Sequence, residues 1–332
     1  MSLDTDISLW LSLAFIVGGL VALVWSADAF IDAAGRIARR FGVSPFVVGM
    51  VIIGFGTSAP ELAVSVLSGL GGHSNLSLGN AYGSSIFNIA VILGLTALVK
   101  PIKVKPAVVR FAVPLLTGIA AISWWLVRDG SFERANGIVL LIAFAVLLPI
   151  YCWYDQKNSG EGGADVPAEA VKVSVFTWLL LLVGLGVLIM SSHILVWGCV
   201  DFARDVLHVS DLMIGLTVVA MGTSLPELAS AVVSARKGEH EFVIGNIVGS
   251  NFFNMLGVVG VAGTLSPFDS FSRFIVVRDL PLIAVLSLSL ALFGVNFRSL
   301  RRQGEINRFE GVLWLLVFAA YLAVIISQES GV

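Results

Sequence analysis

Residues 54–62, GFGTSAPEL, place hydroxyls, a proline and a carboxylate inside a long apolar run. Pro60 has no N–H, so the carbonyl of Gly56 loses its helical donor and the turn is loosened. Thr57 and Glu61 are four residues apart, a spacing that puts both side chains on one face of a helix. An intramembrane carboxylate is costly and usually marks a functional site. The segment therefore predicts oxygen ligands gathered within apolar surroundings.

The same pattern occurs again 166 residues later. GFGTSAPELAVSVLSG at 54–69 aligns with AMGTSLPELASAVVSA at 220–235, and GNAYGSSIFNIAVILG at 79–94 aligns with GNIVGSNFFNMLGVVG at 245–260. No gap is needed, and 16 of the 32 aligned positions are identical. The equivalent polar residues are Thr57 and Thr223, Ser58 and Ser224, Glu61 and Glu227, Asn80 and Asn246, Ser84 and Ser250, and Asn88 and Asn254.

The two copies together supply carboxylates, amide oxygens, hydroxyls and carbonyls freed by Pro60 and Pro226, without His or Cys. Such a set suits hard cations such as Ca²⁺ or Na⁺, and it does not suit zinc or copper. One divalent cation neutralises both carboxylates, and monovalent cations or protons can replace it, which is the logic of exchange. A single copy could be a kinked helix with back-bonded hydroxyls. Two copies, each with a glutamate, favour a cation site.

The composition indicates that lipid surrounds the chain. Hydrophobic residues make up 57% of the 332 residues, charged residues only 13%, and the mean hydropathy is +0.95. A helix needs roughly 20 mostly apolar residues to cross a bilayer. We therefore predict an all-α polytopic membrane protein with ten transmembrane helices, at 8–33, 45–70, 78–98, 108–127, 135–154, 174–200, 211–235, 243–264, 275–296 and 310–327.

The spans divide into two halves around a segment rich in Gly and acidic residues. We predict a first five-helix repeat at 1–154, a cytoplasmic linker at 155–172 and a second repeat at 173–332. Because five is odd, the second repeat enters the membrane inverted, the usual architecture of secondary transporters. Of the 20 basic residues, 15 fall in odd-numbered connections and 5 in even ones. This bias predicts that both termini face away from the cytoplasm.

Residues outside the repeated motifs allow further predictions about single helices. The acidic N-terminus lacks the basic region of a cleavable signal peptide, so the first apolar stretch should remain as a span. Asp28, Asp32 and Arg36 are spaced four apart and predict an interfacial salt-bridge ladder. Tryptophans near span ends predict an aromatic belt. These are Trp10, Trp124, Trp125, Trp153 and Trp314.

GTSxPE followed by GxxGSxxFN, present twice, resembles the sodium/calcium exchanger family within the cation/calcium exchanger superfamily. The resemblance covers nearly the whole chain and is nearest to small prokaryotic-type calcium/sodium antiporters. It implies four cation sites halfway across the membrane. Glu61 and Glu227 would bind calcium with the carbonyls of Thr57 and Thr223. Sodium positions would be lined by Ser58, Ser84, Ser224, Ser250 and backbone oxygens of Gly54 and Ala220, and the central position by Asn88 and Asn254.

Some relatives carry an aspartate at the position of Asn254, and in the potassium-dependent branch an acid there is tied to potassium transport. Here both positions hold asparagine, Asn88 and Asn254, so we do not expect potassium co-transport. The linker also lacks the calcium-binding regulatory domains of animal exchangers.

We predict an Na⁺/Ca²⁺ antiporter that works by alternating access in the inner or plasma membrane. A proton-coupled antiporter of Ca²⁺ or another divalent cation is the main alternative, because protons could also discharge the glutamates. An inverted repeat argues against a cation channel, which usually needs a symmetric subunit ring. The sequence shows no nucleophile–base pair, so an enzyme is not expected. We expect no cofactor, no nucleic acid and no required protein partner, only Ca²⁺, Na⁺ and the bilayer.

Overall fold

Apolar segments in lipid form helices, because only internal hydrogen bonds can satisfy their backbone groups there. The computed structural model describes residues 3–158, 173–205, 220–295 and 303–330, and nearly all of these residues are helical. Among the described residues, eight helices are long and apolar enough to span a membrane, and a bent pair adds a ninth if it is counted as one span. The all-α membrane class is confirmed. The predicted span at 211–235 lies partly outside the described residues.

The first half of the chain contains five predicted spans, several of which are built from more than one helical segment. The segments are α1 (Leu3–Phe41), α2 (Pro45–Val48), η1 (Gly49–Gly54), α3 (Phe55–Thr57), α4 (Ala59–Leu70), α5 (Ser74–Phe87), η2 (Asn88–Leu93), α6 (Gly94–Val99), strand β1 (Ile102–Val104), η3 (Val108–Ala112), α7 (Val113–Val127) and α8 (Arg134–Asn158). The η segments are π-helical turns, which often occur at functional sites.

The helices of the second half follow the same order over its described residues, whereas its strand stands before the last helix. Its segments are α9 (Val175–Asp205), α11 (Ala220–Gly222), α12 (Leu225–Lys237), α13 (His240–Phe252), η6 (Phe253–Val258), α14 (Val259–Leu265), η7 (Ile275–Asp279), α15 (Leu280–Gly294), strand β2 (Gly304–Ile306) and α16 (Arg308–Ser330). The π-helical turns η2 and η6 begin at or beside equivalent asparagines, Asn88 and Asn254.

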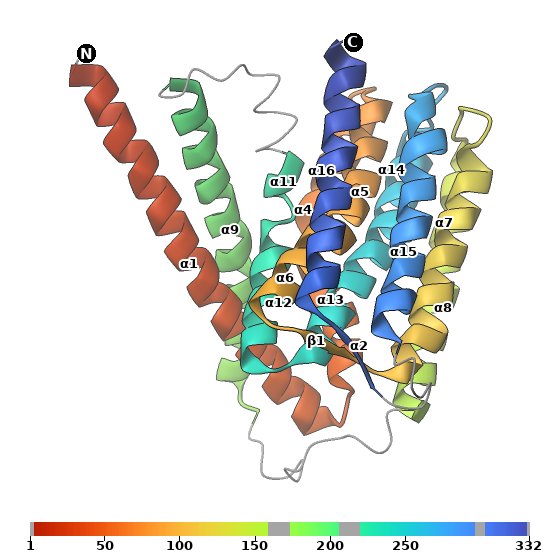
Figure 1. Cartoon of the computed structure of the whole chain (residues 1–332), viewed down its shortest axis with the longest axis horizontal. Coiled ribbons are helices and arrows are strands. Elements are labelled where there is room, and N and C mark those ends of the chain that lie inside the picture. Colours follow the sequence, from red (N-terminus) through yellow and green to blue (C-terminus); the bar gives the residue numbers. More distant parts are fainter. Residues whose placement is uncertain (1–2, 159–172, 206–219, 296–302, 331–332) are drawn as a thin grey trace.

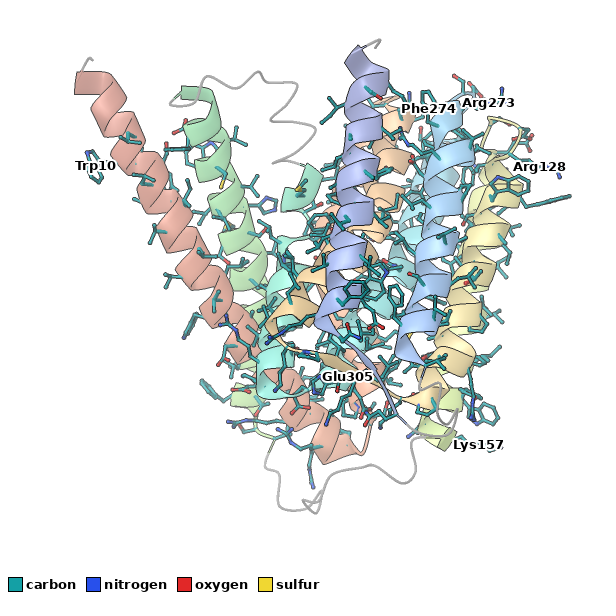
Figure 2. All side chains as sticks on the ribbon, in the orientation of Figure 1. Trp10, Arg128, Lys157, Arg273, Phe274 and Glu305 are labelled. Atoms are coloured by element: carbon teal, nitrogen blue, oxygen red, sulfur yellow. The ribbon has the colours of Figure 1, made fainter. Side chains whose placement is uncertain are left out.

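The equivalent helices α1 and α9 pack along each other and run in opposite directions (Figure 1). We call the two ends of the bundle the terminal end and the linker end, after the parts of the chain that lie there. The terminal end holds the outer ends of α1 and α16, and the linker end holds the end of α8 and the start of α9. Figure 2 places Lys157 and Glu305 at the linker end, and Arg128 and Arg273 at the terminal end. The opposed directions of α1 and α9 are those of an inverted repeat.

Two short backbone pairings tie the halves together at opposite ends of the bundle. At the linker end, β1 pairs antiparallel with β2, with Ile102 opposite Ile306. Residue 102 is equivalent to Phe268, which forms an isolated antiparallel bridge with Phe132. The amide of each phenylalanine donates to the carbonyl of the other, at 2.8 and 2.9 Å. An equivalent antiparallel pairing is therefore found at each end of the bundle, as an inverted repeat predicts.

Several expectations need correction. Helix α1 continues to Phe41, beyond the predicted end at residue 33. Helix α8 continues to Asn158, into the predicted linker, and the Ser44 hydroxyl donates to the carboxylate of Asp155. The rest of that linker, from 159 to 172, lies outside the described residues. Trp314 is buried, and its indole N–H donates to the Ser289 hydroxyl, so it does not belong to an aromatic belt.

The acids of the predicted α1 ladder bind another helix. Both Asp28 and Asp32 lie within 2.8 Å of the ammonium group of Lys237, which ends α12. A second ion pair joins Arg39 to Glu239 at 3.6 Å. These contacts attach α1 to the second repeat at the linker end. The predicted ladder partner was wrong because spacing along one helix says nothing about charges on its neighbours.

The helix that carries Glu61 is broken where the proline pattern predicts. Helix α3 ends at Thr57, Ser58 has φ −84° and ψ 7°, and α4 then starts with Pro60 in its first turn. The two parts are bent by 44°. The second copy breaks in the same way at Ser224, which has φ −93° and ψ 8°. The break arises because proline cannot donate within a helix but suits a helical first turn.

The first and second repeats meet backbone to backbone where η1 crosses α13. A Cβ added at Gly249 would lie 2.3 Å from the carbonyl oxygen of Met50, and one at Gly245 would lie 2.4 Å from that of Phe46. A Cβ at Gly54 would lie 2.9 Å from the amide nitrogen of Ser250. Small residues allow such close approach, which drives helix association in lipid. This crossing brings the two polar motifs together.

We predict that Gly249→Ala separates the two repeats and lowers both stability and transport. The new methyl group meets backbone, which cannot move aside as a flexible side chain can, so the destabilisation should be about 1–3 kcal/mol. The thermal unfolding midpoint in detergent and calcium flux in vesicles measure the two effects. Gly118→Ala is the control, since a Cβ there has nothing within 4 Å. Equal behaviour of the two variants would contradict this packing.

Candidate cation-binding site

The two repeated glutamates are buried beside the crossing of the repeats, and each accepts a hydrogen bond from the opposite repeat. The Ser58 hydroxyl donates to Oε1 of Glu227 at 3.1 Å, and the Ser224 hydroxyl donates to Oε1 of Glu61 at 3.0 Å. Both glutamates are 0% exposed. The two serines are the residues at which the helices break. Each break therefore aims a hydroxyl at the carboxylate of the other half.

The second oxygen of each glutamate is also buried, and it accepts no hydrogen bond from the described residues. The same is true of Oδ1 of Asn88, Oδ1 of Asn254 and the hydroxyl of Thr223. Buried polar atoms are rarely left without a partner, so each case needs an explanation. Every one of these atoms can act as an oxygen ligand. Oxygen atoms that are available to act as ligands are what a site for a hard cation requires.

The equivalent residues Asn80 and Asn246 hold the glutamate helices in place. Nδ2 of Asn80 donates to the backbone carbonyl of Glu61 at 3.1 Å, and Nδ2 of Asn246 donates to that of Glu227 at 3.2 Å. These bonds fix α4 against α5 and α12 against α13. The sequence alignment paired the two asparagines, but it gave them no role. Their role is to position the backbone that carries each carboxylate.

The two threonines of the motif differ. The Thr57 hydroxyl donates to the carbonyl of Ile53 in its own helix at 2.9 Å, and the Thr223 hydroxyl makes no such bond. Each threonine lies beside the carboxylate of the other repeat, Thr57 beside Glu227 and Thr223 beside Glu61. The expected shared helical face of Thr57 and Glu61 assumed a continuous helix. The break at Ser58 puts them on separate segments, α3 and α4, which are bent by 44°. Thr57 is nevertheless buried near the second repeat, 3.4 Å from Oδ1 of Asn246.

The remaining predicted serines and backbone oxygens join the same region. The Ser224 hydroxyl lies 3.4 Å from that of Ser84. The carbonyl of Gly54 accepts from the amide of Ser58 at 3.1 Å and from the Ser250 hydroxyl at 3.3 Å. Ala220 starts α11, and its side chain lies outside the described residues. Direct contacts thus form two sets: Glu61 with Ser224 and Ser84, and Glu227 with Ser58, Gly54 and Ser250.

Two residues that the sequence interpretation left out contact this region. Nδ2 of Asn88 donates to Oδ1 of Asn251 at 3.0 Å, and both side chains are buried. Asn251 is equivalent to Ser85, so a search for identical positions passes over it. The Ser192 hydroxyl of α9 donates to the carbonyl of Gly222 at 2.9 Å, the carbonyl deprived of its helical donor by Pro226. Only a tertiary contact between distant helices could reveal that bond.

The donor chemistry of the site is all-oxygen. Among the described residues, no three His, Cys, Asp or Glu side chains gather as a metal-binding group. The site instead combines two carboxylates with hydroxyl, amide and backbone oxygens from both repeats. Two ionised carboxylates withdrawn from water are costly unless cations accompany them. The arrangement can therefore bind and release hard cations.

Comparison with known proteins agrees with this geometry. Residues 11–153 and 176–327 match the model of the family described as sodium/calcium exchanger protein. The chain belongs to the sodium/calcium exchanger family. This confirms the resemblance seen in the repeated motifs. The family is one of membrane cation antiporters, which is consistent with the expectation that the chain is not an enzyme.

Several prokaryotic relatives of this exchanger-family chain match over nearly their full lengths. The CaxA protein of Alkalimonas amylolytica is 37% identical over 322 residues, covering 95% of this chain and 98% of that protein. The sodium/calcium exchanger MaX1 of Methanosarcina acetivorans is 29% identical, covering 92% and 96%. A solved structure of the sodium-calcium exchanger NCX_Mj, soaked with Na⁺ and Sr²⁺, superposes with a TM-score of 0.79 at 30% identity, covering 95% and 98%.

The crossed serine–glutamate bonds predict matching effects of two substitutions in this exchanger. Ser58→Ala and Ser224→Ala each leave one carboxylate without its donor from the other repeat. We expect each to weaken apparent calcium affinity by about tenfold, the worth of one hydrogen bond to a charged group. The calcium dependence of flux in proteoliposomes measures the effect. Ser327→Ala, on the exposed end of α16, is the control. A loss confined to one of the two serines would contradict the crossed arrangement.

Proposed function

We propose that the protein exchanges Na⁺ for Ca²⁺ by alternating access and does not require K⁺. The observation that supports this best is the pair of fully buried glutamates, each with one unpartnered oxygen. One Ca²⁺ neutralises both carboxylates, and Na⁺ ions can replace it. The state without cations would hold two bare charges in low dielectric. Reorientation of a loaded site is therefore favoured over reorientation of a charged one, which couples the two fluxes.

The division of the apolar core supports alternating access. The described residues form two hydrophobic clusters, one around α1 and α9 and the other around the remaining helices. Helix α12, which carries Glu227, contributes Ala229 and Val233 to the first cluster and Ala231 and Ala235 to the second. The glutamate helix thus lies on the boundary between two separately packed bodies. Relative movement at this boundary would open the site to one end of the bundle or the other.

We propose a location in the plasma membrane, and the charge distribution supports an orientation with both termini on the non-cytoplasmic side. Positive residues favour the cytoplasmic face of a bilayer. The linker end carries Lys157, as well as the ion-paired Arg39 and Lys237. In this orientation the linker end is cytoplasmic, and calcium leaves the cell from there toward the terminal end.

The coupling ion can be tested directly. ⁴⁵Ca²⁺ uptake into proteoliposomes is compared under an imposed sodium gradient and an imposed proton gradient. Sodium coupling requires uptake only when the vesicle interior contains more Na⁺ than the outside. Uptake driven by protons alone would replace the proposal by the proton-coupled antiporter. Calcium entry without any counter-ion gradient would indicate a channel.

We predict that Glu61→Gln and Glu227→Gln each abolish calcium exchange while leaving the fold intact. Glutamine keeps the size of the side chain and an oxygen acceptor for the serine, but it removes the charge that calcium must balance. Sodium-dependent ⁴⁵Ca²⁺ flux and the thermal unfolding midpoint report the two properties. Wild-type rates in either variant would remove that glutamate from the site.

Potassium independence follows from the number of charges. With asparagine at 88 and 254, two glutamates provide two negative charges, which one Ca²⁺ balances. An added K⁺ would be an uncompensated charge, and a unit charge about 4 Å from another is worth about 4 kcal/mol at an effective dielectric of 20. We predict unchanged sodium-driven calcium flux when choline replaces potassium. Asn254→Asp should strengthen cation binding and slow turnover. A wild type that stops without potassium would contradict the charge count.

A further inference from the structure

The hydrogen bond from Asn88 to Asn251 joins a candidate ligand to a residue outside the repeated pattern. We propose that Asn251 is a positioning residue that turns the Asn88 amide oxygen toward the transported cation. The Nδ2–Oδ1 distance is 3.0 Å, and the side chains are 1% and 0% exposed. The inference rests on the proposed function, because it assumes that Asn88 binds a transported cation.

The two ends of an asparagine amide have opposite chemistry. The oxygen only accepts hydrogen bonds and can bind a cation, whereas the NH₂ group only donates and repels one. In the observed orientation, Nδ2 of Asn88 is held by Asn251, and Oδ1 is buried without a partner. The end that would repel a cation is therefore satisfied by protein. The end that can bind a cation is left available.

Asn251 disfavours a turn of the Asn88 amide alone. If Asn88 alone turned over, its Oδ1 would face Oδ1 of Asn251, and two acceptors would meet in a buried place. A turn of both amides would restore one hydrogen bond, but it would present the NH₂ group of Asn88 instead of its oxygen. A cation bound to Oδ1 of Asn88 and the observed hydrogen bond therefore favour the same arrangement. Each stabilises the other.

The second repeat lacks this arrangement. Asn254, the equivalent of Asn88, has neither its nitrogen nor its oxygen bonded to the described residues. The equivalent of Asn251 is Ser85, whose hydroxyl donates to the carbonyl of Ala81 in its own helix at 3.0 Å. One of the two central amides is thus held, and the other is free to turn. The repeat supplies two similar ligands but orients only one of them.

Asn251 is placed to act on the site and not merely on the fold around it. The preceding residue, Ser250, donates to the carbonyl of Gly54 beside the glutamate helix. Asn88 begins η2 four residues after Ser84, which contacts Ser224. The bond between Asn88 and Asn251 therefore connects two backbone segments that each carry a candidate ligand of the same site.

The test uses exchange of ⁴⁵Ca²⁺ against unlabelled Ca²⁺ in proteoliposomes, which needs neither a sodium nor a proton gradient. Two constants are measured for Asn251→Leu: the KM for Ca²⁺ and the Na⁺ concentration that halves exchange. We expect at least one of them to rise on the order of tenfold, the effect of one buried hydrogen bond, with the maximal rate within about twofold of wild type. If both constants stay at their wild-type values in folded protein, the proposal is overturned.

Two further variants separate positioning from folding. Asn251→Ser, the residue of the first repeat, replaces Asn251→Leu if that variant does not fold, and it should show the same rise. Ser85→Ala removes a hydroxyl bound only within its own helix and should leave both constants unchanged. A fall in maximal rate with both constants unchanged, for either Asn251 variant, would indicate a structural role and overturn the proposal.

A second background tests whether Asn251 acts through Asn88. An aspartate at 88 has two equivalent oxygens and needs no orientation, so Asn251→Leu should change the constants less than about twofold in Asn88→Asp protein. A tenfold change in that background would overturn the proposal. Failure of the proposed function looks different, because wild-type protein without calcium self-exchange, or with proton-driven uptake, would reveal it before any variant is compared.

Discussion

Two carboxylates withdrawn from solvent, on helices that meet at the boundary of the two repeats, constrain everything else in this protein. Leaving an ionised group buried without compensation costs several kcal/mol. Each of Glu61 and Glu227 accepts a hydrogen bond from a serine of the other repeat and lies beside a threonine hydroxyl of that repeat. The protein thus compensates each charge only in part. The remainder must come from cations, and this incomplete compensation makes the site able to bind them and to release them.

The unusual backbone of the centre follows from that requirement. The serines that donate to the opposite glutamates, Ser58 and Ser224, lie where Pro60 and Pro226 interrupt the helices. The repeats must also approach closely, which the glycines of α13 and η1 allow. Lipid supplies little apolar driving force between helices, so small residues and polar contacts hold the crossing together. Breaks, glycines and buried polar groups are therefore parts of one solution.

The sequence predicts most of the helices and the membership of the site, because both depend on local patterns. Long apolar runs and an ungapped repeat identify the spans, the equivalence of the halves and the glutamates. Contacts between distant segments could not be predicted in the same way. The partner of Asp28 and Asp32 is Lys237, and the partner of the Gly222 carbonyl is Ser192. Neither follows from spacing, because each depends on how separate helices pack.

Equivalent positions also diverge within a short distance of the site. Asn80 and Asn246 make the same bond, but the neighbouring Ser65 and Ser77 exchange hydrogen bonds with each other's backbone, whereas their equivalents, Ala231 and Val243, are buried apolar residues. Both repeats must act on the same cations, so the carboxylates and their serines are identical in kind. The surrounding helices face opposite ends of the bundle and need no such match. The unequal pair Asn251 and Ser85 lies between the matched ligands and the unmatched surroundings. One half of a nearly symmetric site can therefore fix a ligand that the other half leaves free to move.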